Sequence, residues 1–351
     1  LVGRNLVPPN YSLAWGNAAV NVGGPLTDSI WAVGGALDAE GTDIMMARFD
    51  ANGLDTSYSN DGMGIYHFTA YPHEEGKAVV ATSDGKIIVG ANSCTSDPYY
   101  GLACRTFIVR LNAATGQRDT TFGNAGVVIL GAAQFPNRSD EMHGLAVDQY
   151  GGVIVVTEQR KSTFYAGDVV IRRVTPTGQP DTAFAAGAGQ RRFGFSTAGG
   201  VAIDPSTHRI VVSGGNYDGT AQYVWQISYS GILIRGFGGS KNVADGWAEI
   251  DYTSRSEERP GAVKIDRLGR IILLGSAWGP SAASFTVVRL QQNGEPDTSF
   301  DNDDGKEYVT FPTSPDSFGL GLHLGYDTIT VAGLGVSGSS EKFAIARIAN
   351  P

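Results

Sequence analysis

Carboxylates and histidines gather at corresponding positions along this chain, just ahead of short runs of small apolar residues. The acidic positions are Glu74, Glu75, Asp140, Glu141, Glu257, Glu258 and Asp316. Oxygen atoms from several such carboxylates can hold Ca²⁺, and a pair of carboxylates can act as acid and base toward a sugar. His73 and His143 neighbour these carboxylates, and an imidazole there can serve as a general base or a metal ligand.

These positions supply the candidates for catalysis and metal binding. The catalytic candidates are Glu74, Asp140, Glu141, His143 and Glu258, and the candidates for a calcium site are Glu75 and Asp316. The alternative is that each carboxylate caps nearby backbone N–H groups or pairs with an Arg, because clustered carboxylates are often structural. No H-E-x-x-H pair, G-x-S-x-G elbow, P-loop or dinucleotide pattern is present, so no motif specifies a reaction.

Aromatic residues are plentiful in the long loops that the same pattern predicts. The ligand-binding candidates are His73, Tyr99, Tyr100, Tyr165, Tyr217, Trp247 and Trp278. Flat rings beside carboxylates suit the stacking of a sugar, and they suit a protein partner equally well. A glycan and a surface protein are therefore both expected as partners.

A repeat of about 60 residues must position these side chains. Its clearest copy runs from Arg289 to Phe311, with a strand ending in Arg, a turn closed by Gly294, and an Asp-x-x-Phe step before the next strand. The copies are anchored at residues 48, 110, 173, 226, 289 and 347, and successive anchors differ by 62, 63, 53, 63 and 58. This period fits a four-stranded propeller blade with generous loops.

Each copy contains a small-residue strand, a more apolar strand, the Arg-terminated strand and a strand after Asp-x-x-Phe. The sequence therefore predicts an all-β, six-bladed β-propeller of four-stranded antiparallel blades, forming one domain over residues 1–351. The last copy lacks its fourth strand, whereas GRNLVP at Gly3 resembles GKEYVTFP at Gly305. We expect residues Leu1–Pro8 to complete the sixth blade and close the ring.

The pattern R-[FL]-x-x-x-G-x-x-D-x-x-F-x-x-x-G, followed by a strand such as DGKIIV at Asp84, resembles the bacterial delta-60 repeat β-propeller family. The resemblance covers nearly all of the chain, with Gln226 and Ile234 departing from it in the fourth copy. It implies a secreted or surface-exposed propeller and no single established activity. Because the Arg and Asp recur in most copies, we interpret them as structural, with Asp satisfying turn N–H groups.

Composition narrows the partners and the compartment. The formal net charge of −9 argues against binding a nucleic-acid backbone, and Arg191-Arg192 is expected on a solvated loop. No apolar run approaches the roughly 20 residues of a membrane span. Cys94 and Cys104 flank one loop and are expected to form a disulfide, which predicts a secreted, periplasmic or cell-surface protein. We expect a monomer.

Alternating strand directions place the long loops and the strand-start carboxylates on one face of the ring, where ligands of propellers tend to bind. Three functions fit. The first is a binding module for a glycan or protein on that face. The second is an extracellular polysaccharide lyase, hydrolase or lactonase-like enzyme with an acidic, calcium-assisted site, and the third is a structural module of a larger surface protein.

Overall fold

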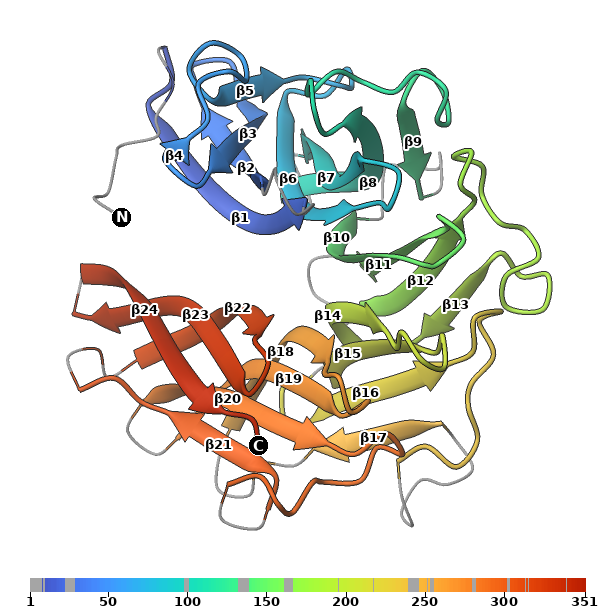
Figure 1. The fold of residues 1–351 in the computed structure, drawn as a ribbon, viewed down its shortest axis with the longest axis vertical. Helices are drawn as coiled ribbons and strands as arrows, with labels where there is room; N and C mark the ends of the chain where they lie inside the picture. The colour runs from blue at the N-terminus through green and yellow to red at the C-terminus, as the bar shows by residue number, and fades with distance from the viewer. Residues whose placement is uncertain are drawn as a thin grey trace. The chain divides into compact units, whose positions relative to one another are not determined.

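The computed structural model describes residues 8, 10–22, 29–97, 101–131, 139–160, 167–194, 196–216, 218–238, 246–250, 252, 256–279, 282–301, 304–312, 314, 316–338 and 340–351. Every regular element in these ranges is a β-strand (Figure 1). None of the described residues forms a helix long and apolar enough to cross a membrane. The chain divides into a first unit, Leu1–Tyr165 with Arg173–Asp181, and a second unit, Ala166–Arg172 with Thr182–Pro351. A single domain over residues 1–351 stays a prediction.

The first unit begins with two four-stranded antiparallel sheets, which one parallel pair between Thr42 and His73 joins into a larger sheet. The strands of the first sheet are β1 (Leu13–Val22), β2 (Ser29–Leu37), β3 (Thr42–Asp50) and β5 (Met63–Tyr66), with the short β4 (Gly53–Leu54) also paired to β3. Those of the second are β6 (His73–Ala81), β7 (Lys86–Asp97), β8 (Gly101–Asn112) and β9 (Val127–Leu130). The first unit also contains β10 (Ser139–Val147) and β11 (Val153–Arg160), which pair antiparallel. The strands β12 (Asp168–Val174) and β13 (Gln190–Phe193) pair with each other, and except for the last two residues of β12 they belong to the second unit.

The second unit continues the same antiparallel pattern. One sheet contains β14 (Ser196–Ile203), β15 (Ile210–Asn216), β16 (Gln222–Ile227) and β17 (Trp247–Ile250). The next contains β18 (Ser256–Ile265), β19 (Ile271–Trp278), β20 (Ala283–Leu290) and β21 (Lys306–Val309). The last has three strands among the described residues: β22 (Asp316–Leu324), β23 (Thr328–Ser337) and β24 (Ser340–Ala349).

The middle strands are buried on both faces, which explains their nearly continuous apolar sequences. In β11, VIVVTEQR has seven buried residues in succession, and all eight residues of β20 are buried. Sheets covered on both faces lose the alternation of apolar and polar residues that marks a half-exposed strand. The apolar core lies between successive sheets, as where Val263 and Leu273 pack with Val224 and Phe237.

A β-bulge interrupts the pairing of the first and second strands in every one of these sheets. The bulges lie at Gly16/Ala18, Gly76/Ala78, Met142/Gly144, Ala198/Val201, Pro260/Val263 and Gly319/Gly321. A bulge bends its strand and increases the local twist. The small residues of these strands also permit close packing, because a Cβ at Gly76 would collide with Cγ2 of Val33.

The repeated Arg and Asp form the predicted structural brace. The Nε atoms of Arg48, Arg110 and Arg289 lie 2.7, 3.0 and 2.7 Å from the carboxylates of Asp55, Asp119 and Asp297, respectively. Each Asp also accepts the backbone N–H two residues later, and Arg48 and Arg110 donate to a backbone carbonyl in the following repeat. The prediction of a structural role is confirmed.

One expectation from the sequence needs correction. The pair Arg191-Arg192, expected in a loop, lies in β13 and pairs with β12. The proposed closing segment Leu1–Pro8 lies, except for Pro8, outside the described residues.

Candidate functional site

Three of the predicted catalytic and metal candidates have carboxylates that accept backbone N–H groups close by. Glu74, which is fully buried, accepts from Phe68 at 2.7 Å and Thr69 at 2.5 Å. Glu258 accepts from Tyr252 at 3.1 Å, and Asp316 accepts from Ala283 at 2.9 Å. Each carboxylate therefore ties a preceding segment to the start of the first strand of a sheet.

Glu141 and His143 lie together on β10 in the first unit, with Glu158 and Arg160 of β11 beside them. The Nε2 atom of His143 lies 3.8 Å from Oε2 of Glu158, whose Oε1 accepts from Nε of Arg160 at 2.6 Å. Glu141 accepts a hydrogen bond from Ser139 at 3.1 Å. Partial burial lowers the pKa of His143, and the charges of Glu158 and Glu141 oppose that shift. The imidazole is therefore uncharged at neutral pH.

The other polar candidates of the first unit have partners of their own. Asp140 is buried and accepts from the side chain of Gln159 at 3.4 Å. Glu75 pairs with Lys77 at 2.7 Å and accepts from Asn17 at 2.7 Å. His73 is half-buried at the start of β6.

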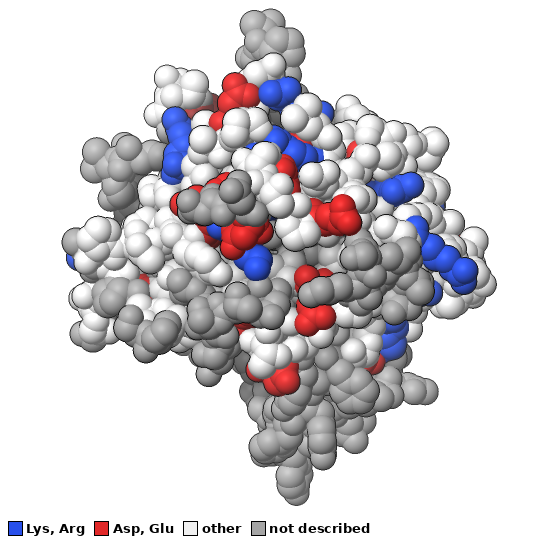
Figure 2. Space-filling model, turned by 90° about the horizontal axis from the view of Figure 1, so that it is seen from below, with Lys and Arg blue, Asp and Glu red and all other residues white. Residues whose placement is uncertain are grey.

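No group of three or more His, Cys, Asp or Glu side chains within the described ranges is arranged to hold a metal ion. The calcium site predicted around Glu75 and Asp316 thus has no ligand set in that part of the chain, and calcium stays a prediction. Asp and Glu side chains on the face shown in Figure 2 form several separate small groups with uncharged surface between them.

The aromatic candidates fall into two groups. Tyr99, Tyr100, Tyr165 and Tyr217 lie outside the described residues. Trp278, at the end of β19, packs against Phe318 with ring centroids 5.1 Å apart and lies beside the guanidinium of Arg259. Trp247, at the start of β17, lines a pocket.

That pocket has a volume of about 640 Å³ and lies in the second unit. The lining comes from three strands, one strand start and one turn. It consists of Arg191, Arg192 and Phe193 of β13, Gly194 directly after β13, Ser196 at the start of β14, Tyr223 and Trp225 of β16, Trp247 of β17, and Ile232, Leu233 and Arg235 of the turn between β16 and β17. The volume is within the usual range for small-molecule sites.

Four aromatic rings form one side of this pocket in a connected series. Phe193 stacks on Trp225, with ring centroids 4.5 Å apart and planes 9° apart. Tyr223 meets Trp225 and Trp247 edge to face, at centroid distances of 5.8 and 5.0 Å. Trp225 is buried, whereas Phe193, Tyr223 and Trp247 are half-buried, so these three rings present surface to a ligand.

Three arginines supply the charge of the pocket. Arg192 pairs with Asp168 at 2.6 Å, and Arg235 is exposed. The Nε atom of Arg191 is buried and has no hydrogen-bond partner among the described residues. The lining contains three Arg and no Asp or Glu, so it is positive within a chain whose net charge is −9.

Sequence reasoning found Trp247 and overlooked the rest of this pocket. One signal was present, because GQRRF at Gly189 corresponds to GKEYV at Gly305 and indicates a fourth strand rather than a loop. No sequence pattern indicates that strands from two successive sheets line one pocket. It depends on how β13 packs beside β16 and β17.

Comparisons with known proteins address the fold. A family model described as "Domain of unknown function (DUF5122) beta-propeller" matches residues 269–300, which include β19, β20 and the Asp-x-x-Phe turn. No curated protein matches the chain. The crystal structure of polysaccharide lyase Uly1 is similar at 10% identity and a TM-score of 0.53, covering 95% of this chain and 77% of that chain.

Two further solved structures are similar at the same level. A glucose dehydrogenase has 11% identity and a TM-score of 0.51, with 91% of this chain and 92% of that chain covered. A protein of unknown function from Dyadobacter fermentans DSM 18053 has 8% identity and a TM-score of 0.51, with 96% of this chain and 95% of that chain covered. At such low identities the likeness concerns the fold alone. Together with the repeated four-stranded antiparallel sheets, it supports a β-propeller fold for this chain.

Proposed function

We propose that this protein is a secreted or surface-exposed β-propeller that binds a carbohydrate in the aromatic pocket of the second unit. The observation that carries the proposal is the pair of half-buried rings, Tyr223 and Trp247, held edge to face at 5.0 Å on one side of a pocket of about 640 Å³. Rings of this kind bind the apolar faces of sugars, and nearby polar groups bind the hydroxyls.

The pocket is built rigidly enough for this task. Phe193 stacks on Trp225, and Trp225 meets the ring of Tyr223 edge to face, so packed aromatic rings support the position of Tyr223. Burial raises the pKa of Tyr223, and the charges of Glu249 and Asp218 raise it further. The phenol therefore stays protonated at neutral pH and can donate a hydrogen bond to a sugar hydroxyl.

An extracellular location fits the covalent structure. Cys94 and Cys104 form a disulfide, as the sequence predicted. Disulfides persist in oxidising compartments and are rare in the cytosol. A polysaccharide lyase is among the proteins that share the fold, and sugars outside the cell are a suitable class of ligand for such a protein.

The propeller itself we propose to have six four-stranded blades, with Leu1–Pro8 adding the fourth strand to β24. The sheet of β22, β23 and β24 has three strands in the described part of the chain, whereas the sheet before it has four. Exposed apolar side chains on β24, Phe343 and Ile345, correspond to the buried Phe285 and Val287 of β20. A fourth strand paired with β24 would help to cover these two side chains.

An enzyme acting on a polysaccharide is the second candidate function. The observation that favours it is the uncharged imidazole of His143 close to Glu158 and Glu141. A neutral imidazole can take up a proton, and a carboxylate beside it can stabilise the resulting charge. In this reading Glu141 and His143 carry the chemistry.

The test is retention of the protein on a panel of immobilised polysaccharides, with product release measured in the same samples. We expect Trp247→Ala to weaken retention about five- to thirtyfold, because the ring supplies stacking worth about 1–2 kcal/mol per contact. Tyr326→Ala, at a ring that is 75% exposed and does not line the pocket, is the matched control and should bind normally. Unchanged binding of the Trp247 variant would remove the pocket from consideration. Product release that Glu141→Gln abolishes would favour the enzyme.

A further inference from the structure

We infer that the carbohydrate bound in this pocket is anionic, carrying carboxylate or sulfate groups that Arg191 and Arg235 receive. The inference rests on the proposed function and specifies its ligand class. Its basis is the arrangement of charge around the pocket rather than the aromatic rings.

The unpartnered nitrogen of Arg191 is the first observation. Its Nε is buried at the edge of the pocket, and within the described residues no acceptor lies within hydrogen-bonding distance of it. The guanidinium carbon lies 5.7 Å from the ring centroid of Phe193, so the side chain is held along the aromatic side of the pocket. Buried donors in proteins are almost always satisfied, which indicates that a ligand provides the missing acceptor.

The distribution of charge is the second observation. Asp168 already neutralises Arg192 through a contact of 2.6 Å, whereas Arg235, in the turn after β16, is exposed and also lines the pocket. With no Asp or Glu in the lining, Arg191 and Arg235 leave an excess of positive charge there. A planar guanidinium binds carboxylate and sulfate oxygens through two parallel hydrogen bonds.

The acidic residues near Tyr223 give the ligand a direction. Glu249, opposite Tyr223 in the pairing of β16 and β17, raises the pKa of that phenol, as does Asp218. An anionic group of the ligand would be repelled near Glu249 and Asp218 and attracted near the arginines.

The experiment compares charged polymers with neutral polymers of the same backbone. Polygalacturonate is tested against its carboxyl-reduced form, and dextran sulfate against dextran, by affinity electrophoresis at several NaCl concentrations. We expect one charged polymer to retain the protein and its neutral form not to, with retention falling as salt rises. The two pairs distinguish a carboxylate from a sulfate.

Variants locate the charge recognition. Arg191→Gln and Arg235→Gln are each expected to weaken retention on the charged polymer about tenfold, since each loses charge-assisted hydrogen bonds. Arg267→Gln, at an exposed arginine that pairs with Asp327 away from the pocket, is the control and should bind as wild type. Because Arg235 is exposed, its variant tests the inference even where Arg191→Gln impairs folding.

The outcomes separate this inference from the proposed function. Equal retention on charged and neutral polymers would overturn the anionic ligand and leave carbohydrate binding intact. Charge-dependent retention that neither arginine variant weakens would overturn the assignment to this pocket. No retention on any polymer, neutral or charged, would overturn the proposed function, and this inference with it.

Discussion

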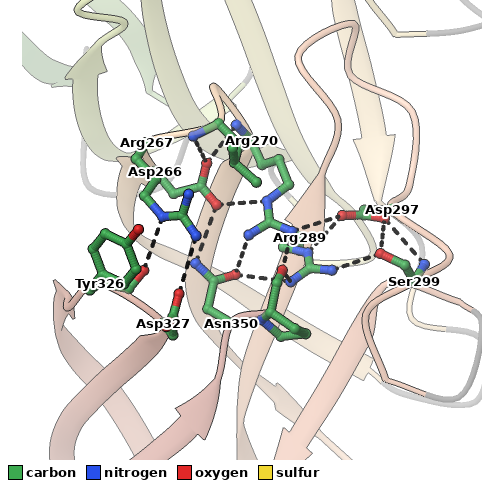
Figure 3. Close-up of polar contacts among 11 residues, drawn as sticks. Asp266, Arg267, Arg270, Arg289, Asp297, Ser299, Tyr326, Asp327 and Asn350 are labelled. Atoms are coloured by element: carbon green, nitrogen blue, oxygen red, sulfur yellow. Dashed lines mark hydrogen bonds and ion pairs between the residues drawn. The ribbon is translucent and has the colours of Figure 1, made fainter.

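Arg289 shows how a single buried charge can be satisfied completely by its surroundings. It is fully buried, and Figure 3 shows its guanidinium between Asp297 and Asn350. Nε donates to Asp297 at 2.7 Å, Nη1 to the side chain of Asn350 at 2.9 Å and Nη2 to Ser299 at 2.9 Å. Removing one partner of a buried pair of this kind destabilises the fold strongly, because the other charge is left buried and unpaired.

The fourth copy of the repeat shows that the backbone can close this turn without the Arg–Asp pair. Gln226 takes the position of the Arg, and its side-chain amide donates to the carbonyl of Gln292 at 3.4 Å. The backbone bond that closes the turn, from Ile234 N–H to the carbonyl of Gln226, is 2.9 Å, as is the equivalent bond between Asp297 and Arg289. The turn therefore depends on the backbone, and the charged pair adds to it.

At the residue scale we predict that Asp297→Asn lowers the free energy of unfolding by about 3 kcal/mol at pH 7, because Arg289 loses its charged partner. Urea denaturation followed by intrinsic fluorescence measures this difference. Asp304→Asn, at an exposed carboxylate that accepts from the backbone of Lys306, is the control and should change it little. A wild-type midpoint in Asp297→Asn would contradict the brace.

The same residue predicts the direction of acid destabilisation. Burial raises the pKa of Asp297, but hydrogen bonds from Ser299 and the charge and hydrogen bond of Arg289 outweigh it, so the pKa is lowered. A lowered folded-state pKa contributes stability above the unfolded value of about 3.9, and that stability is lost as pH falls further. The difference between wild type and Asp297→Asn should therefore shrink below about pH 4.

At the scale of elements, the hairpin of β7 and β8 has the longest strands among the described residues and is closed covalently. Cys94 and Cys104 are directly opposite in its register, and their Cα atoms are 4.0 Å apart. The disulfide spans a separation of 10 residues and restricts the unfolded chain between them. It joins the two strands at Cys94 and Cys104, which are buried like Phe107 and Val109 further along β8.

We predict that the double variant Cys94→Ser/Cys104→Ser loses about 2–3 kcal/mol of stability, as expected for a loop of this length. Thermal unfolding with and without dithiothreitol is the measurement. The reductant should lower the midpoint of the wild type and leave that of the double variant unchanged. A reductant effect on both proteins would show that the disulfide is not the cause.

At the scale of the whole molecule, we propose that the N-terminal segment pairs with β24 and closes a ring. By correspondence with the pairing of Glu307 and Val287, Asn5 should lie opposite Ile345 of β24. The sheet edge would then be covered, and Phe343 and Ile345 would gain the packing that Phe285 and Val287 have. This is a prediction about residues outside those that the structure describes.

We predict that Asn5→Cys/Ile345→Cys forms a second disulfide in high yield under mild oxidation, detected by peptide mapping under non-reducing conditions. The pair Asn5→Cys/Glu341→Cys, four residues out of register, is the matched control and should remain reduced. Equal cross-linking of both pairs would indicate a loose segment, and cross-linking of neither would rule out this closing strand.

Much of the architecture and little of the proposed site could be predicted from the sequence, because the two depend on different ranges of interaction. Strands such as β11 and β20, the turn at Gly294 with its φ of 86°, and the pairing of Arg48 with Asp55 all follow from residues near in sequence and repeated along it. The disulfide followed from two cysteines flanking one loop. Local periodicity and repetition determine features of this kind.

Tertiary structure decided where the proposed ligand pocket lies. It buried Glu74 against two backbone N–H groups, where the sequence allowed either a structural or a catalytic role. It also brought Arg191 of β13 beside Trp225 and Trp247, from a different sheet, and left the Arg191 Nε without a partner within the described part of the chain. Such a pocket arises from the packing of successive sheets, whose spacing and register no periodicity in the sequence records.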